Sequence, residues 1–389
     1  MGNASKKGLN IAIEEKEIDN SCLNRINIIR LKHTNDTKMI KLNLKQQKII
    51  TILLKMGDMQ SSLILKELVK SGEGMSLVTV KRALSEMVNL GVLIVNGSGR
   101  SVKYGVSAVG RIFFNIDIYA YCSIEPDKRY GLKQYNFDLF PSIPNNIFTD
   151  DELSYLESVT AKYKQRTTDF SSTIQRKELE RFVIELSWKS SKIEGNTYTL
   201  LDTEKLILEN KKAVGKTEEE TRMILNHKDA FNFIYKNAEQ FKVVTRKNLE
   251  ELHAILTKNL GVDNGLRKVM VGITGSTYKP LDNVYQIGDA LEALMATIER
   301  IETPHAKALM ALLGISYIQP FEDGNKRTGR LMANAILLAY GLPPLSYRSI
   351  DEDEYRKATL VFYELNSIIE FKKIFIAQYD FTAQNYTIV

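Results

Sequence analysis

The segment Gln319–Arg330 reads QPFEDGNKRTGR and decides the fold of the C-terminal half of this chain. Apolar residues at helical spacing precede it from Ala306 to Tyr317, and a second helical pattern follows through Leu331 toward Gly341. The segment is therefore predicted to be a tight loop that opens a helix. Because the free amides of a helix N-terminus bind phosphate oxygens, this loop is a candidate anion site.

Three charged side chains in the loop strengthen this prediction. Arg327 and Arg330 are three residues apart, so they share one face of the first helical turn and add guanidinium donors that suit phosphate. Asp323 places a carboxylate beside the expected phosphates, where it suits a Mg²⁺ ion that keeps most of its waters. On the residues alone, a capped helix start with two solvated arginines is an equal alternative.

A second feature is a carboxylate at the wrong end of a helix. An apolar stripe from about Lys177 to Ile193 predicts a helix that ends at Gly195, a natural C-terminal cap. Glu194 lies in its last turn, where the helix dipole already presents negative charge. We therefore expect Glu194 to be either solvated or paired with a cation from elsewhere in the chain.

Positive charge gathers near the N-terminus. Residues 38–104 hold eleven lysines and arginines against four acidic residues, a balance of +7 in a chain whose net charge is +6, so the remainder is close to neutral. A small basic module on a neutral body is typical of proteins that bind nucleic acid, because lysine and arginine contacts to phosphates supply most of the non-specific affinity.

The same module has a recognisable order of elements. Helices are expected over Leu44–Met56 and Ser61–Lys70, and a third over Ser76–Leu90 with Ser76 as N-cap. The stretch from Val92 to Tyr104 predicts a β-hairpin with an Asn-Gly turn. This order resembles a winged helix-turn-helix domain, in which the third helix would read double-stranded DNA. The candidate DNA contacts are Lys81, Arg82, Arg100 and Lys103, although such modules also dock on proteins and a basic face can be plain solvated surface.

Changes in composition, together with residues that end or begin helices, divide the chain into four parts. We expect a polar tail over residues 1–37, the winged helix-turn-helix domain over 38–107, an aromatic-rich connector over 108–148 that packs on something, and a helical domain over 149–389. Thr149 and Glu152 form a capping box where the last part begins.

The composition excludes several classes of protein. With 44% hydrophobic and 26% charged residues, the chain is typical of folded proteins, and no apolar run reaches the roughly 18 residues of a membrane span. The two cysteines, Cys22 and Cys122, and the scattered histidines offer no zinc-ligand spacing and suit a cytoplasmic location. His227 and His253 lie on helical stretches and are expected to be satisfied structural residues.

The loop resembles the signature of the Fic family, His-Pro-Phe-x-x-Gly-Asn-Gly-Arg-x-x-Arg. A second family element, Ser/Thr-x-x-x-Glu-Gly, is matched by Ser190 to Gly195. The resemblance extends from about Thr149 to the C-terminus and includes a segment similar to the family's β-hairpin flap, which aligns a target peptide. The loop matches the signature at Pro320, Phe321, Gly324, Asn325, Arg327 and Arg330, and the flap residues are Ile273, Thr274, Gly275 and Ser276.

The resemblance implies a mainly α fold: an all-helical Fic domain with a β-hairpin flap, preceded by the small α+β winged-helix domain. It also implies transfer of AMP from ATP to a hydroxyl of a target protein. Asp323 would hold Mg²⁺, the amides around Gly324 and Asn325 would bind the inner phosphates, and Arg327 and Arg330 would bind the outer ones. Glu194, with Ser190 in the same motif, would be inhibitory by pairing with Arg330.

Two positions depart from the family. The catalytic histidine is Gln319 here, and an amide cannot accept the proton of an attacking hydroxyl near neutral pH. Lys326 replaces a glycine and adds a positive charge at the phosphates, as in the Doc branch, whose members act as protein kinases with ATP bound in the opposite orientation.

The sequence is therefore compatible with three functions. The first is an autoinhibited and impaired protein adenylyltransferase that uses ATP and Mg²⁺ on an unknown protein target. The second is a DNA-binding transcriptional regulator whose Fic domain is a pseudoenzyme that senses nucleotide. The third is a Doc-like protein kinase. A homo-oligomer is compatible with each of them.

Overall fold

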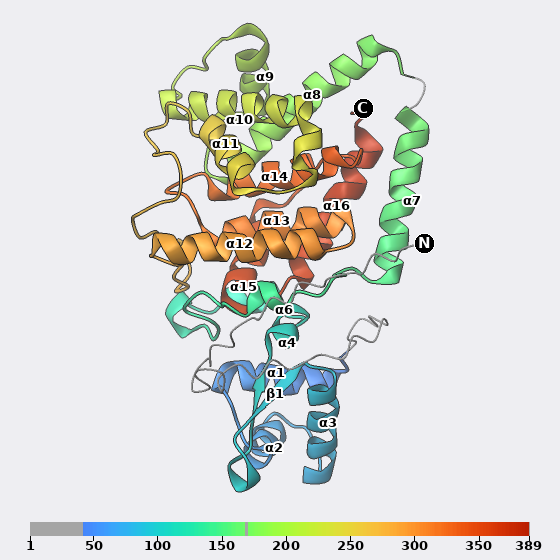
Figure 1. Cartoon of the computed structure of the whole chain (residues 1–389), viewed down its shortest axis with the longest axis vertical. Coiled ribbons are helices and arrows are strands. Elements are labelled where there is room, and N and C mark those ends of the chain that lie inside the picture. The colour runs from blue at the N-terminus through green and yellow to red at the C-terminus, as the bar shows by residue number, and fades with distance from the viewer. Residues whose placement is uncertain (1–41, 168–169, 389) are drawn as a thin grey trace, which may run out of the picture. The chain divides into compact units, whose positions relative to one another are not determined.

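The computed structural model describes residues 42–167 and 170–388, and the predicted polar tail and Cys22 lie outside these ranges. The chain is mainly helical, with one two-stranded antiparallel sheet in the described part (Figure 1). The elements are α1 (Leu44–Met56), α2 (Ser61–Lys70), α3 (Leu77–Asn89), β1 (Leu93–Asn96), η2 (Gly99–Ser101), β2 (Lys103–Val106), α4 (Ala108–Ile112), α5 (Ile118–Cys122), η3 (Pro126–Lys128), α6 (Leu139–Ser142), α7 (Asp150–Thr167), α8 (Ser172–Ile193), α9 (Leu200–Glu209), α10 (Glu218–Lys236), η4 (Ala238–Lys242), α11 (Arg246–Leu256), α12 (Val284–Arg300), α13 (Pro304–Ile318), α14 (Asn325–Ala339), α15 (Glu352–Leu365) and α16 (Ile369–Asn385).

The centre of the main core is the pair α13 and α14. α13 is apolar on every face and is buried almost along its whole length, as expected of a helix without a polar side. It lies between α12 and α14 (Figure 1), while α8, α10 and α11 contact the other side of α14. The loop that joins α13 to α14 is the first half of the segment singled out in the sequence, and the second half is the start of α14. The two ends of the loop are therefore fixed by buried helices.

The first three helices and the sheet have their own small core. Ile49, Ile64 and Leu84, one from each helix, are fully buried in it, and Val361 and Leu365 of α15 belong to the same cluster. The bounds of α1 and α2 are those expected from the sequence, and Ser76 caps α3 through a hydrogen bond from the amide of Thr79.

The expected β-hairpin is present, but its connection is longer than an Asn-Gly turn. Asn96 of β1 pairs with Lys103 of β2, so six residues form the connection. Ser98 and Ser101 bond each other's backbone and hold η2 within that loop. A two-residue Asn-Gly turn would pair Val95 with Ser98, whereas Val95 pairs with Tyr104. The local bonds of Ser101 to the backbone of Ser98 compete with strand pairing, so β2 begins only at Lys103.

The connector of residues 108–148 is folded against the rest of the chain. Its Phe114, Phe140 and Phe148 are buried, and the capping box between Thr149 and Glu152 opens α7 as expected. The connector therefore belongs to the packed body of the protein and is not a flexible linker.

The predicted β-hairpin flap is corrected by the structure. Within the described residues, the segment 265–283 forms no paired strands of its own, and its single β-bridge joins Lys279 to Gln134 of the connector. Its turn is bound from outside: Arg129 donates to the carbonyl of Gly275, and Ser276 Oγ donates to Glu364 at 2.6 Å. These contacts with other segments replace the hydrogen bonds that would pair the two arms of a hairpin.

Within residues 42–167 and 170–388, no helix combines the length and the apolar character needed to cross a lipid bilayer.

Candidate functional site

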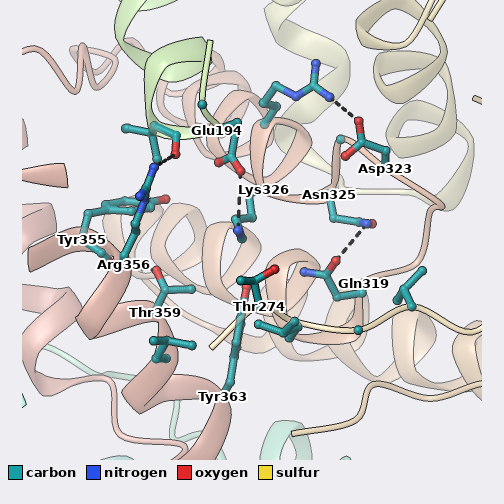
Figure 2. Close-up of a pocket in the computed structure, with 18 of the residues that line it drawn as sticks. Glu194, Thr274, Gln319, Asp323, Asn325, Lys326, Tyr355, Arg356, Thr359 and Tyr363 are labelled. Carbon is teal, nitrogen blue, oxygen red and sulfur yellow. Dashed lines mark hydrogen bonds and ion pairs between the residues drawn. The ribbon is translucent and has the colours of Figure 1, made fainter. Parts of the chain in front are cut away.

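A cavity of about 540 Å³ opens in front of the α13–α14 loop (Figure 2). Its walls come from the loop, from the C-terminal end of α8, from the segment 271–274 and from α15. The lining residues are Ile193, Glu194, Gly195, Val271, Gly272, Ile273, Thr274, Gln319, Glu322, Asp323, Gly324, Asn325, Lys326, Arg327, Tyr355, Arg356, Thr359, Leu360 and Tyr363. The structure thus brings most of the predicted site residues together around one space.

The loop presents the start of α14 to this cavity. Gly324 takes a left-handed conformation with φ 77°, which a side chain would strain, and it leaves the first amides of α14 without a side-chain cap. Asn325 fixes the loop behind it, because its Oδ1 accepts from the amide of Phe321 at 2.8 Å and its Nδ2 donates to the carbonyl of Phe321 at 2.8 Å. The result is a rigid nest of amides suited to phosphate oxygens.

Gln319 lines the cavity with a side chain that is held at both ends. Its Nε2 donates to the carbonyl of Ser316 at 2.7 Å, and its Oε1 accepts from Asn325 Nδ2 at 3.1 Å. Arg267 donates to its carbonyl at 2.6 Å and so fixes the backbone, which has φ 52° at this position. The amide is therefore an ordered part of the loop and offers no basic nitrogen.

Asp323 and Arg327 form an ion pair at the edge of the cavity. Arg327 is buried and its Nη2 lies 2.8 Å from Asp323 Oδ2, whereas the Asp323 side chain is 64% exposed. No cluster of three or more potential ligands exists among the described residues, so the protein offers one exposed carboxylate rather than a metal cage. This donor set fits Mg²⁺, which binds one or two carboxylates together with nucleotide phosphates and water.

Arg330 does not face the cavity freely. It is fully buried, and its Nη1 donates to Glu194 Oε1 at 2.8 Å while Nε and Nη2 donate to the hydroxyl and carbonyl of Ser190 at 2.9 Å each. Lys326 adds a weaker contact, with Nζ 3.5 Å from Glu194 Oε2. Of the two states expected for Glu194, solvated or paired with a distant cation, the structure shows the pairing, and Arg330 is the cation.

The protonation states follow from these contacts. Burial alone would raise the pKa of Glu194, but Arg330 and Lys326 outweigh it and lower that pKa below its usual value. The charge of Glu194 in turn raises the pKa of Arg330 although burial opposes it. Both groups are therefore charged near neutral pH.

Sequence reasoning missed two contributions to the site. Tyr355, Thr359 and Tyr363 of α15 line the cavity at helical spacing, but nothing in the chain predicted which element that face would meet. His253 of α11 stacks on Phe321 and bonds the carbonyl of Asp323 through Nε2 at 3.0 Å. His253 therefore supports the loop from behind.

The expectation that His227 is a satisfied structural residue is wrong. It is fully buried, and neither ring nitrogen has a hydrogen-bond partner in the described part of the chain. Burial, reinforced by Arg330 and Arg327, lowers its pKa well below 6.5, so its ring is neutral. A neutral ring is the form that tolerates a buried position beside two arginines.

Comparison with known proteins finds a family match in the region that contains this loop. Residues 243–337 match the model of the Fic/DOC family and contain the loop and α14 up to Leu337. The chain is 31% identical over 173 residues to a "Protein adenylyltransferase Fic" of Nematostella vectensis, covering 43% of this chain and 40% of that protein. A protein of the same name in Drosophila persimilis is 32% identical over 186 residues, covering 45% and 35%. The match to a Fic domain therefore lies in residues 243–337, and the aligned region spans less than half the length of each of these relatives.

Solved structures give the same fold at lower identity. Fic-1 from C. elegans superposes with a TM-score of 0.53 at 21% identity, over 61% of this chain and 72% of that one. A Fic family protein from Desulfovibrio desulfuricans G20 superposes with a TM-score of 0.51 at 21% identity, over 62% and 75%. The mainly helical Fic fold expected from the sequence is therefore confirmed.

Proposed function

We propose that the cavity binds ATP with Mg²⁺ for AMP transfer to a protein hydroxyl, and that this activity is restrained by Glu194 and impaired at Gln319. The observation that carries the proposal is the enclosure of Arg330, a buried cation at the start of α14 whose donors go to Ser190 and Glu194. A cation held in this way cannot receive the outer phosphate until the Glu194 carboxylate leaves.

The chemistry divides among the residues of the loop. The amides near Gly324 and Asn325 would bind the inner phosphates, and Lys326, Arg327 and released Arg330 would bind the outer ones. A bound Mg²⁺, held by Asp323 and phosphate oxygens, would neutralise charge that develops on the pyrophosphate. The target hydroxyl oxygen would bond to the α-phosphorus as the bond to pyrophosphate breaks.

The proton of that hydroxyl needs an acceptor, and Gln319 is a poor one. Loss of a general base costs about 10²- to 10⁴-fold in rate. Because the Gln319 amide is bound to Ser316 and Asn325, it cannot turn to serve the hydroxyl in another way. We therefore expect nucleotide binding to survive and transfer to be slow.

The test is the intact mass of the protein after incubation with Mg²⁺ and ATP, using Glu194→Gly and the double variant Glu194→Gly, Gln319→His. An AMP-sized adduct on the double variant alone is expected. An adduct on the single variant would show that transfer does not need the histidine, and a phosphate-sized adduct would favour a Doc-like kinase. Unchanged ATP affinity in Glu194→Gly would contradict the inhibitory role.

A second candidate function concerns the N-terminal module. Its helix α3 buries Val80, Leu84 and Met87, and leaves Lys81 and Arg82 exposed on the opposite face. Arg100 and Lys103 are exposed in the hairpin and at the start of β2. We propose that this winged-helix-like surface binds double-stranded DNA, in which case the Fic domain would act as a nucleotide-sensing pseudoenzyme of a transcriptional regulator.

A further inference from the structure

The last turn of α8 is held by a second arginine that lies outside the Fic motif. A helix ends with carbonyl groups that lack partners within the helix. In α8 the carbonyls of Ser191 and Lys192 accept from amides that follow directly in the chain, and that of Ser190 accepts from Arg330. The carbonyl of Ile193, the final residue, accepts from Nη2 of Arg356 at 2.9 Å.

Arg356 reaches this carbonyl from α15, across the rim of the cavity (Figure 2). It is exposed, whereas the Ile193 side chain that it helps to place is buried. Ile193 directly precedes Glu194, so the backbone position of one residue fixes where the carboxylate of the next can reach. A cation at this carbonyl also opposes the negative end of the helix dipole.

Arg356 binds the backbone of α8, whereas the other charged contact between α15 and this end of α8 joins side chains. Glu352, one turn earlier on α15, pairs with Lys189 and Lys192 through side chains at 2.9 and 3.5 Å. Those pairs join two long side chains and can adjust without moving the backbone. The Arg356 contact instead binds the main chain next to Glu194.

We propose that Arg356 is a positioning residue for inhibition: it holds the last turn of α8 so that Glu194 stays on Arg330. The inference rests on the proposed inhibitory role of Glu194. Arg356 itself contacts neither the Glu194 carboxylate nor Arg330, and it acts through the Ile193 carbonyl. Removing its guanidinium should loosen the turn and make Arg330 more available to the nucleotide.

The test measures ATP affinity with Mg²⁺ by calorimetry for Arg356→Met. One charge-assisted hydrogen bond at a partly exposed helix end predicts a dissociation constant about three- to tenfold lower than in the parent protein. A gain in affinity is informative because general damage to the fold would weaken binding. Arg356→Lys keeps a donor on the carbonyl and should stay within about twofold of the parent.

The matched control is Arg348→Met. Arg348 also binds α8, but through the Glu185 side chain at 3.1 Å in the middle of the helix. Its removal should leave ATP affinity within about twofold, because a partly exposed pair far from the last turn contributes little. An equal gain in both variants would overturn the specific role of Arg356.

A double-mutant cycle separates this inference from the function on which it rests. In the Glu194→Gly background, Arg356→Met should have no further effect, because there is no carboxylate left to position. A loss of affinity in that background would mean that Arg356 contacts the nucleotide, and would overturn the proposal. If Glu194→Gly raises affinity but Arg356→Met alone does not, the positioning role fails while the inhibitory glutamate stands. If Glu194→Gly itself has no effect, both fail.

Discussion

The imidazole ring of His253 lies flat against the ring of Phe321, with centroids 3.7 Å apart and planes 10° apart. Its Nε2 also bonds the carbonyl of Asp323 at 3.0 Å, so one side chain supports both ends of a three-residue stretch of the loop. The α13–α14 loop is therefore supported by a neutral aromatic ring from α11 that does not line the cavity.

Removing this support should destabilise the protein. We expect His253→Ala to lower the free energy of unfolding by about 2–4 kcal/mol, since it opens a buried space and leaves the Asp323 carbonyl without a partner. Urea denaturation followed by circular dichroism measures the change. His253→Phe keeps the stack and should lose about 1 kcal/mol; equal losses in the two variants would mean that the stack contributes nothing.

Acid should weaken the fold before carboxylates become protonated. Burial lowers the pKa of His253 to about 4 and that of His305 to about 4, whereas an unfolded histidine titrates near 6.5. Between these values the unfolded chain binds more protons, so stability falls as the pH falls from about 6.5 toward 4. Each histidine should contribute a loss of about 2 kcal/mol by pH 5.

Thermal melts at pH 7, 6 and 5 would follow this loss, and His253→Phe should reduce its slope. Glu220 does not contribute to this loss. Hydrogen bonds from Thr197 and Thr217 lower its pKa to about 2, so its contribution to stability is lost only at pH values below the usual pKa of a glutamate. A melting temperature that does not change between pH 7 and 5 would contradict the assignment of neutral, buried histidines.

Glu194→Gln should move stability and ligand affinity in opposite directions. The substitution leaves the buried Arg330 without its counter-charge, which is expected to cost about 3 kcal/mol in unfolding free energy. ATP should bind more tightly, because the phosphate can now supply the missing charge. Calorimetric titration measures the gain in ATP affinity, and urea denaturation of the same preparation measures the loss in unfolding free energy.

An exposed pair supplies the control for Glu194→Gln. Glu218 pairs with Lys212 and Arg222 at 3.3 and 3.2 Å on the surface, and Glu218→Gln should change stability by less than about 1 kcal/mol and leave ATP affinity unchanged. Lower ATP affinity in Glu194→Gln would show that Glu194 supports binding instead of opposing it.

Two helical glycines should respond to alanine with opposite signs. A Cβ at Gly329 of α14 would lie 2.9 Å from the carbonyl oxygen of Leu312 in α13, so Gly329→Ala should destabilise by about 1–3 kcal/mol. Gly288 of α12 has open space around the same position, and Gly288→Ala should stabilise by about 0.5–1 kcal/mol through helix propensity. Thermal denaturation of the two variants measures both changes in stability. If Gly329→Ala leaves the stability unchanged, α13 and α14 can move apart at little cost in free energy.

The N-terminal module should bind duplex DNA in a salt-dependent way. Substituting Lys81 and Arg82 together by alanine should lower the slope of log affinity against log salt by about 2, since each phosphate contact contributes close to 1. Fluorescence anisotropy with a labelled mixed-sequence duplex gives that slope. Lys236→Ala, at an exposed position of α10, is the control, and an equal change there would indicate non-specific attraction.

The sequence predicted most of what depends on local rules. α1 and α2 end where glycine and capping residues stop the helical pattern, and the segment from Gln319 to Arg330 forms a tight loop that opens a helix, as expected. The pairing of Glu194 with a cation also followed from a local rule, because a carboxylate at a helix C-terminus is unfavourable unless it is matched.

The predictions that the structure contradicts concern contacts between segments far apart in the sequence. The flap was expected to pair with itself, but Arg129 and Glu364, both far away along the chain, bind its turn. Tyr355 and Thr359 of α15 line the cavity, yet no local pattern in the sequence indicated that this helix would reach it. His227 was misjudged for the same reason, since its surroundings come from other helices.

The burial of α13 and α14 determines where control of this protein can be exerted. Because both helices that anchor the α13–α14 loop are buried along most of their length, we expect the loop to keep its position relative to the core. We therefore expect movement at the wall formed by the end of α8, where Ser190 and Glu194 contact Arg330 of α14 through three hydrogen bonds. Under the proposed function, a partner that displaces that helix end would therefore release Arg330 without altering the chemistry of the loop.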